Sequence, residues 1–261
     1  MPKSLVLLQK KNHIAGITLN RPGENNLINL QMGQEMEEIC LDINQDNDIY
    51  VAIISGIGAV FCGGHELQKS FQSDNKQSRS DAEIAQKYNV AACVANIEKP
   101  VIAAINGDAL GEGLELALAC DVRISAQNAH FGFPEVSKGL IPSDGGTQRL
   151  PRIIGRGNAL ELILTGEIID AAKALEIGLV SKIVPAEALV ADVDAFAKAM
   201  TAKAPVSLRY IKEAINKGLD LTMEQGLRLE ADLYFLLHTT VDRTEGIKAF
   251  QQKRLPEFKG Q

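Results

Sequence analysis

The sequence lacks the patterns that signal metal, disulfide or membrane chemistry. Its four cysteines form no Cys-x-x-Cys pair and no dense framework, which predicts reduced thiols and a cytoplasmic protein. Its four histidines include no pair spaced one helical turn apart, so we expect no metal site. No apolar run approaches the roughly 18 residues that a membrane span needs. The first residues carry too short an apolar run for a signal peptide.

Positive charge is also scarce. The 261 residues carry a formal net charge of −6, and no long basic run interrupts them. Binding to nucleic acid or to an anionic membrane therefore has no electrostatic support, and neither is expected as a partner. The hydrophobic content of 46% is ordinary for a globular protein and is enough for a sizeable core.

Residues 99–146 organise the chain. Residues 101–105 are branched or small and apolar, as in a fully buried strand. Gly107, Gly111 and Gly113 follow, and residues 114–120 then read as a short apolar helix. Glycine lets a ligand approach the backbone closely, and the first turn of a helix has unpaired N–H groups. The stretch therefore predicts a place that holds an oxygen carrying negative charge.

Two carboxylates accompany this turn. Glu115 lies on the predicted helix and Glu135 follows the sequence FGFP, near enough along the chain to meet in one pocket. From these residues alone an ordinary interpretation stays open for each. Glu115 would lie on a solvated polar stripe, and Glu135 would be a first-turn acid favoured by the helix dipole.

The periodicity of the whole chain predicts an α/β core followed by helices. Strands are expected at residues 5–8, 14–19, 50–55, 101–105 and 179–184. Helices are expected from residue 30 and at residues 81–97, 114–120, 147–154, 158–164, 171–177, 186–203, 205–217, 223–238 and 242–253. Between them, residues 68–80 are polar and predict a mobile loop. We expect a core domain over residues 1–200 and a C-terminal helical region over residues 201–261, as one continuous unit.

A faint internal repeat supports the anion site. The segments YVAIISGIGAVFCGG and PVIAAINGDALGEG both run from an apolar strand through a glycine to a short connection and a second glycine turn. Two similar strand ends lying side by side would direct two backbone N–H groups at one oxygen. Acyl chemistry needs this geometry to stabilise an oxyanion.

Six segments in order resemble the crotonase superfamily, and among its members the enoyl-CoA hydratases most closely. They are LNRP, FCGGHEL, KPVIAAINGDALGEGLELALACD, FGFPEVSKGLIPSDGGTQRLPRIIG, LTGEIIDAAKALEIGLVSKIVP and DRTEGIKAFQQKRLPEF. The resemblance implies a spiral of ββα units with a C-terminal helical trimerisation region. It also implies a homotrimer or a dimer of trimers. The expected substrate is an acyl-CoA thioester, and no cofactor is expected because coenzyme A is part of the substrate.

The same resemblance assigns residues by position. Glu115 and Glu135 match the two catalytic glutamates, and the N–H groups of Gly63 and Glu112 would bind the thioester oxygen. The matching turns place substrate contacts at Cys62, Gly64, His65, Glu66, Leu67, Gly111 and Asp144.

Two positions depart from the hydratase pattern. Glu112 stands where these enzymes usually have glycine, so its carboxylate must point away to leave the oxyanion site undisturbed. Asp144 adds a third acid, which acts at the pocket or caps the following helix. The leading prediction is hydration of 2-enoyl-CoA to 3-hydroxyacyl-CoA. The alternatives are an enoyl-CoA or dienoyl-CoA double-bond isomerase and a non-catalytic acyl-CoA-binding relative.

Overall fold

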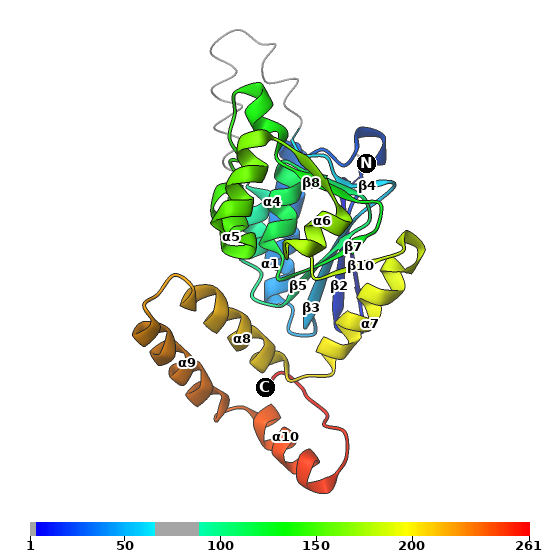
Figure 1. Cartoon of the computed structure of the whole chain (residues 1–261). Helices are drawn as coiled ribbons and strands as arrows, with labels where there is room; N and C mark the ends of the chain where they lie inside the picture. Colours follow the sequence, from blue (N-terminus) through cyan, green and yellow to red (C-terminus); the bar gives the residue numbers. More distant parts are fainter. Residues whose placement is uncertain (1–3, 66–88) are drawn as a thin grey trace.

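The fold is a spiral in which each turn adds one strand to each of two sheets and then a helix (Figure 1). The computed structural model describes residues 4–65 and 89–261. The first turn consists of β3 (Val51–Gly56), β4 (Val60–Cys62) and α3 (Val90–Ala95). The second consists of β5 (Val101–Ile105), β6 (Asp108–Leu110) and α4 (Glu112–Ala119). The third consists of β7 (Val122–Ala126), β8 (His130–Gly132) and α5 (Gly146–Thr165).

The two sheets follow from this repetition. The larger has the order β1-β2-β3-β5-β7-β10 and the smaller β4-β6-β8-β9. The added strands are β1 (Val6–Lys11), β2 (Ile14–Leu19), β9 (Ile168–Asp170) and β10 (Lys182–Val184). The β1–β2 hairpin and the β8–β9 pair are antiparallel, and the other pairs are parallel. Because β4 and β6 are parallel neighbours, the two glycine turns that follow them lie side by side, as the sequence repeat predicts.

Helices cover the larger sheet and continue beyond it. Those outside the spiral are α1 (Leu30–Gln45), α6 (Ala171–Glu176), α7 (Leu189–Thr201), α8 (Pro205–Gly218), α9 (Met223–Leu237) and α10 (Val241–Gln252). Short 3-10 helices occupy Pro22–Glu24 (η1), Pro134–Lys138 (η2) and Ala186–Ala188 (η3). The prediction of an α/β core followed by helices is confirmed. Of the part that the structure describes, no helix is long and apolar enough to cross a membrane.

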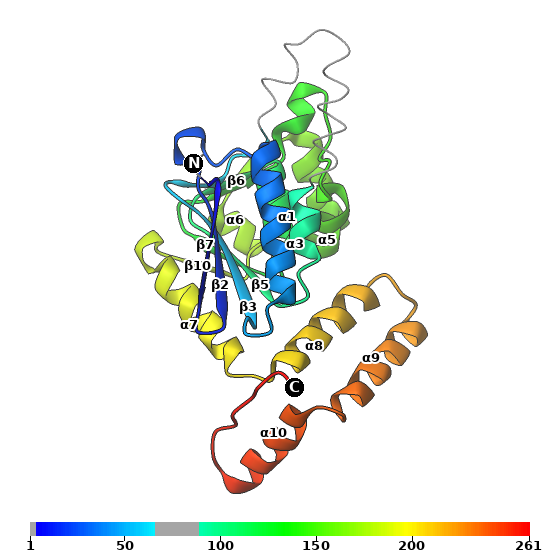
Figure 2. The ribbon, with the colours of Figure 1, turned by 180° about the vertical axis from the view of Figure 1, so that it is seen from behind.

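Alternating side chains of the larger sheet build two cores. Val51, Ile102 and Ile124 face α7 and pack there with Val193. Their neighbours along the strands, such as Ile54, point to the opposite face, where the larger cluster includes residues of α1, α3, α4 and α5. Figures 1 and 2 show α7 on one face of the sheet and α1, α4 and α5 on the other. The site below is built on the helices of the larger core.

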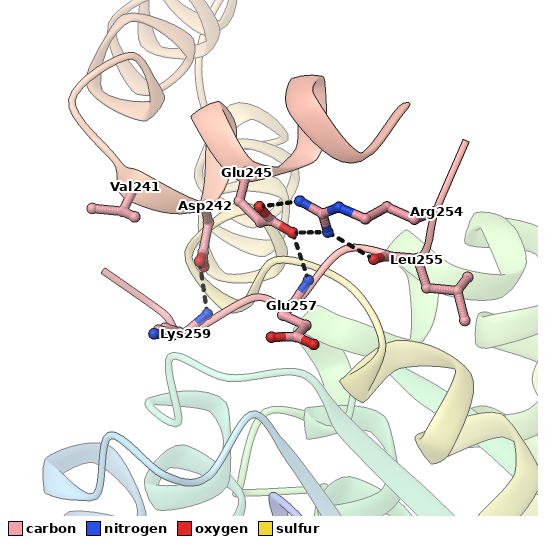
Figure 3. A pocket seen from close by; sticks show the side chains of 7 residues that line it. All are labelled: Val241, Asp242, Glu245, Arg254, Leu255, Glu257 and Lys259. Carbon is pink, nitrogen blue, oxygen red and sulfur yellow. Dashed lines mark hydrogen bonds and ion pairs between the residues drawn. The ribbon is translucent and has the colours of Figure 1, made fainter. Parts of the chain in front are cut away.

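The helices α8, α9 and α10 extend away from the sheets (Figures 1 and 2). A salt bridge of 2.8 Å from Lys212 to Asp121 attaches α8 to the core. The chain end folds back on α10, where the Asp242 carboxylate accepts the N–H groups of Lys259 (2.7 Å) and Gly260 (2.8 Å). Figure 3 shows the cavity of about 560 Å³ between α10 and this tail, which shares no residue with the predicted site.

Two predicted elements differ in detail. The helix expected over residues 81–97 is described only as α3, which starts after Asn89 because the Asn89 side chain accepts the N–H of Ala92. Residues 81–88 and the predicted mobile loop at 68–80 lie outside the described residues. The two helices expected on either side of Gly155 are present within α5, which breaks at a kink where Gly155 adopts φ 78° and ψ 158°. The boundary after residue 200 stays a prediction.

Candidate active site

The turn from β6 into α4 requires glycine. Gly111 adopts φ 54° and ψ −127°, which side chains disfavour. A β-carbon at this position would overlap Oε1 of Glu135. The Gly111 N–H donates to the carbonyl of Gly132 (3.0 Å), which ties the turn to β8. Gly111 therefore allows the Glu135 carboxyl group to lie directly against the start of α4.

Glu115 is completely buried, so the interpretation as a solvated stripe is wrong. Helix α4 is buried almost all round, because α3, α5, β4 and β6 all pack against it. Oε1 of Glu115 accepts the N–H groups of Asp144 (2.8 Å) and Gly146 (2.6 Å). Its Oε2 has no partner among the described residues. The carboxyl group is thus held by one oxygen, and the other is free to bind water.

Glu135 lies in the first turn of η2 and is half-buried. Its Oε2 is a buried atom with no hydrogen-bond partner among residues 4–65 and 89–261. Its Oε1 lies beside Gly111. Glu135 therefore lies across Gly111, and Glu115 follows one helical turn later on α4, where its backbone N–H donates to the Gly111 carbonyl (3.0 Å).

Asp144 contributes a third buried carboxyl group, with 8% of its surface exposed. Its Oδ2 accepts the N–H of Ala91 (2.9 Å) in the first turn of α3. It does not cap the following helix, because the N-cap of α5 is Gly145 with no side-chain hydrogen bond. Asp144 thus connects two segments: the loop whose N–H groups bind Glu115, and the first turn of α3.

Burial raises the pKa of all three acids. It raises the pKa of Glu115 to about 7, opposed by the two N–H donors and assisted by the nearby Asp144 and Glu112. It raises the pKa of Asp144 to about 6, against the N–H of Ala91 and the charge of Arg149. It also raises the pKa of Glu135, with Glu112 adding to the effect. Acids whose pKa lies near neutrality can both accept and donate protons at physiological pH.

Of the two N–H groups predicted to bind the oxyanion, those of Glu112 and Gly63, only one is free of a hydrogen bond to a described residue. Glu112 is the first residue of α4, and its N–H has no acceptor among the residues that the structure describes. The N–H of Gly63, in contrast, donates to the carbonyl of Asn25 (2.9 Å). The expectation that Gly63 provides the second donor is therefore wrong for this conformation, because its hydrogen is already bound within the protein.

The backbone N–H of His65 is a better candidate than that of Gly63 for the second oxyanion donor. Ile28 and His65 form a parallel bridge in which the Ile28 N–H donates to the Gly64 carbonyl (2.8 Å). In this pattern the N–H of Ile28 bonds to the residue before His65 and not to His65 itself, so the N–H of His65 points away from Ile28. A β-carbon on Gly64 would lie 3.8 Å from the Glu112 nitrogen. The residue before His65 therefore lies beside the N–H of Glu112 at the start of α4.

The Glu112 carboxylate does not point away from the first glycine turn. A β-carbon at Gly64 would lie 3.4 Å from its Oε2. Its charge is among the causes that raise the pKa values of Glu115, Glu135 and Asp144. Glu112 thus contributes negative charge to the site as well as an N–H donor.

Three other predicted contact residues have different outcomes. Cys62 is fully buried and its Sγ lies 3.3 Å from the carbonyl of Asn26, so its side chain belongs to the core and the predicted substrate contact is wrong. Its backbone lies so close to Gly113 that a β-carbon there would overlap the Cys62 carbonyl. Glu66 and Leu67 lie outside the described residues.

Asn26 supports the site and was missed from the sequence. It is fully buried, and its Nδ2 lies within hydrogen-bond distance of the carbonyls of Ile57 (3.0 Å), Val60 (2.8 Å) and Phe61 (3.2 Å). Its Oδ1 accepts the N–H of Arg21 (2.9 Å). Asn26 therefore holds β4 and the connection before it against the loop after β2. The signal available in the sequence was an asparagine pair after the segment LNRP, a motif typical of a turn.

Known proteins share both this sequence and this fold. A family model described as enoyl-CoA hydratase/isomerase matches residues 9–261. A crotonyl-CoA hydratase of Syntrophomonas wolfei is 38% identical over 254 residues, which are 97% of each chain. A 2,3-dehydroadipyl-CoA hydratase of Escherichia coli is 36% identical over 261 aligned residues, covering 98% of this chain and 99% of the relative.

A solved structure agrees with the architecture. The crystal structure of an enoyl-CoA hydratase from Bacillus anthracis superposes with a TM-score of 0.93 at 38% identity, covering 98% of this chain and 100% of that one. The predicted spiral fold is thereby confirmed. With its α/β crotonase fold and a family match over nearly its full length, the chain belongs to the enoyl-CoA hydratase/isomerase family.

Proposed function

We propose that the chain adds water to 2-enoyl-CoA thioesters and produces 3-hydroxyacyl-CoA. One observation carries the proposal: Glu135 lies against Gly111, Glu115 lies one helical turn after it on α4, and each carboxyl group has a buried oxygen with no partner among the described residues. A buried polar atom without a partner is unfavourable by about 1–3 kcal/mol, so a bound water or substrate would satisfy it.

The environments of the two acids suggest their roles. Burial raises the pKa of Glu115 to about 7, so a large fraction of it is ionised at neutral pH, and the two N–H groups on Oε1 stabilise that carboxylate; it would hold a water through Oε2 and take its proton. The resulting hydroxide adds to the β-carbon. Glu135 receives no such pair of donors, and burial favours its protonated form, so Glu135 would give a proton to the α-carbon. General acid–base catalysis of this kind contributes about 10²–10⁴-fold.

The thioester oxygen gains negative charge as the hydroxide adds. The N–H of Glu112 at the start of α4 and the N–H of His65 would stabilise this charge. In related chemistry, removing one such donor raises the barrier by about 3 kcal/mol. In this role His65 contributes its backbone rather than its imidazole ring.

A panel of enoyl-CoA thioesters with mass-spectrometric detection tests the proposal. It should include crotonyl-CoA and 2,3-dehydroadipyl-CoA, because the names of two relatives specify these acyl groups. A product heavier than its substrate by one water is expected for at least one thioester. Tight binding with every thioester returned unchanged would instead indicate a non-catalytic acyl-CoA-binding protein.

Double-bond isomerisation is the second candidate, and Asp144 is the observation that favours it. A third buried acid with an unpartnered oxygen, Oδ1, could move a proton between two carbons of the acyl chain. The mass of the product distinguishes the two reactions, since isomerisation leaves the mass unchanged. The hydrogen bond from Ala91 to Asp144 engages one carboxylate oxygen, which favours hydration by Glu115 and Glu135 as the main reaction.

We also propose a homotrimer or a dimer of trimers in a reducing, cytoplasmic environment. Large apolar side chains are exposed on α8, α9 and α10: Ile211, Ile215, Leu227, Tyr234, Phe235 and Phe250. Such a surface is unusual for a monomer and fits a second copy of the chain. The four free cysteines agree with a reducing compartment. Light scattering should give the mass of three or six chains, and a monomer would contradict the assembly.

A further inference from the structure

The loop before α5 connects Asp144 directly to Glu115. The Asp144 N–H donates to Oε1 of Glu115 over 2.8 Å, and the Gly146 N–H donates to the same oxygen over 2.6 Å. Glu115 is 0% exposed and Asp144 is 8% exposed. Because water screens neither carboxyl group well, the charge of one acts strongly on the other.

The Asp144 carboxylate is held in place by α3. Its Oδ2 accepts the N–H of Ala91 over 2.9 Å, and its Oδ1 is buried with no partner in the described part of the chain. Arg149 is the nearest cation that acts on it, but its Nη1 donates to the backbone carbonyl of Asp144 (2.7 Å) and not to the carboxylate. Among the residues that the structure describes, no direct ion pair neutralises the negative charge of Asp144 beside Glu115.

The other groups around the pair lie on several elements. They are Glu112 on α4, Glu135 on η2, Arg149 on α5, Asp108 on β6, and the thiols of Cys62 on β4 and Cys93 on α3. Burial raises the pKa of both thiols, so they are neutral near pH 7. Asp108 is bonded to His130 (2.8 Å) on the exposed side of β6. Of the acids that act on Glu115, Asp144 has the larger effect and Glu112 the smaller.

We propose that Asp144 is a positioning residue: its N–H orients Glu115, and its buried negative charge sets the pH at which Glu115 becomes a base. The proposal rests on the proposed hydration. Hydration by Glu115 and Glu135 has no step for a third acid, and the contacts of Asp144 lead to Glu115 and to α3. Through Asp144, Glu115 would keep its proton to a higher pH and be a stronger base once it has lost it.

The variant Asp144→Asn tests the charge while it keeps an oxygen that can accept the Ala91 N–H. The pH dependence of kcat/KM with crotonyl-CoA should show its acidic limb moved to lower pH by about 0.5–1 unit, as expected when a neighbouring like charge is removed. KM should change little. The matched control is Asp108→Asn, which removes a carboxylate from β6 outside the site and should leave the limb where it is.

A carbon-13 titration of the glutamate carboxyl groups provides a second readout that needs no turnover. The Glu115 resonance is assigned by its absence from Glu115→Gln. In the unmodified protein this resonance should titrate at a higher pH than in Asp144→Asn, by the same amount of about 0.5–1 unit.

Two results would overturn the proposal. One is a titration of Glu115 that is the same with and without the Asp144 charge. The other is a loss of stability in Asp144→Asn with the acidic limb unmoved, which would assign Asp144 only to the packing of α3. If the unmodified protein hydrates no enoyl-CoA, the proposed function fails, but the titration still decides whether the two acids are coupled.

Discussion

Replacing Glu115 by glutamine should stabilise the protein and inactivate it. Burial raises the pKa of Glu115 from 4.5 to about 7. In the unfolded chain this carboxyl group ionises near its ordinary value. As pH rises from about 4.5 to about 7, the unfolded state therefore loses its proton before the folded state does, and the free energy of unfolding decreases. Above about pH 7 the loss is complete and constant.

The magnitude follows from the size of the shift. The difference between about 7 and 4.5 corresponds to roughly 3 kcal/mol at about 1.4 kcal/mol per pKa unit. Glutamine keeps an oxygen for the N–H groups of Asp144 and Gly146, but it places an NH₂ group at the unpartnered position of Oε2. With the desolvation of that group included, we expect Glu115→Gln to be more stable than the unmodified protein by about 1–3 kcal/mol at pH 8.

Urea unfolding at pH 4.5 and pH 8, at one fixed protein concentration, measures the effect. The stability difference between Glu115→Gln and the unmodified protein should increase toward pH 8. Glu38→Gln, which changes an exposed carboxylate on α1, is the control and should show little difference at either pH. A difference for Glu115→Gln that is the same at both pH values, or a destabilisation that grows with pH, would refute the reasoning.

Three further predictions concern the frame of the site. Gly111→Ala should lower kcat/KM by at least about 10²-fold and stability by about 1–3 kcal/mol, because its β-carbon would overlap Glu135 at a disfavoured φ; Gly157→Ala, which meets no atom within 4 Å, should retain activity in the same assay. Asn26→Ala should reduce the free energy of unfolding by about 2–4 kcal/mol, since it leaves the carbonyls of β4 and of the connection before it without their donor; an unchanged urea midpoint would contradict this. Asp242→Ala removes the carboxylate that binds the tail after α10, so protease should cleave the tail faster than in the unmodified protein. Enoyl-CoA turnover at low protein concentration measures any effect of the change on assembly.

The periodicity predicted the α/β core and the C-terminal helices because those patterns are local, whereas the spiral was expected only from the resemblance to the crotonases. The apolar run of β5, the glycines after it and the helical spacing of α1 each identify an element, but the strands of the smaller sheet were not predicted, because each is only three residues long. Glu115 could not be read as buried from its own helix, since its burial comes from α3, α5 and two strands that pack around α4.

The site was predicted less completely than the fold because its hydrogen bonds join distant segments. The motif placed an oxyanion donor at Gly63, but whether that N–H is free depends on the carbonyl of Asn25. Similarly, the sequence presented Asp144 as a pocket acid or a cap of α5, whereas its carboxylate binds the first turn of α3, some fifty residues earlier. A sequence motif therefore identifies the segment that forms the site. Which N–H of that segment can bind a substrate oxygen depends on the hydrogen bonds that its backbone makes with distant residues.

The rate of crotonyl-CoA hydration by the variant carrying both Glu115→Gln and Glu135→Gln tests the central claim most directly. Both replacements keep the size of the side chain and remove the ability to exchange a proton, so folding should survive while catalysis does not. We expect the rate to decrease by at least about 10⁴-fold, with crotonyl-CoA still bound. Hydration by the double variant at a rate close to that of the unmodified protein would contradict the assignment of the reaction to these two acids.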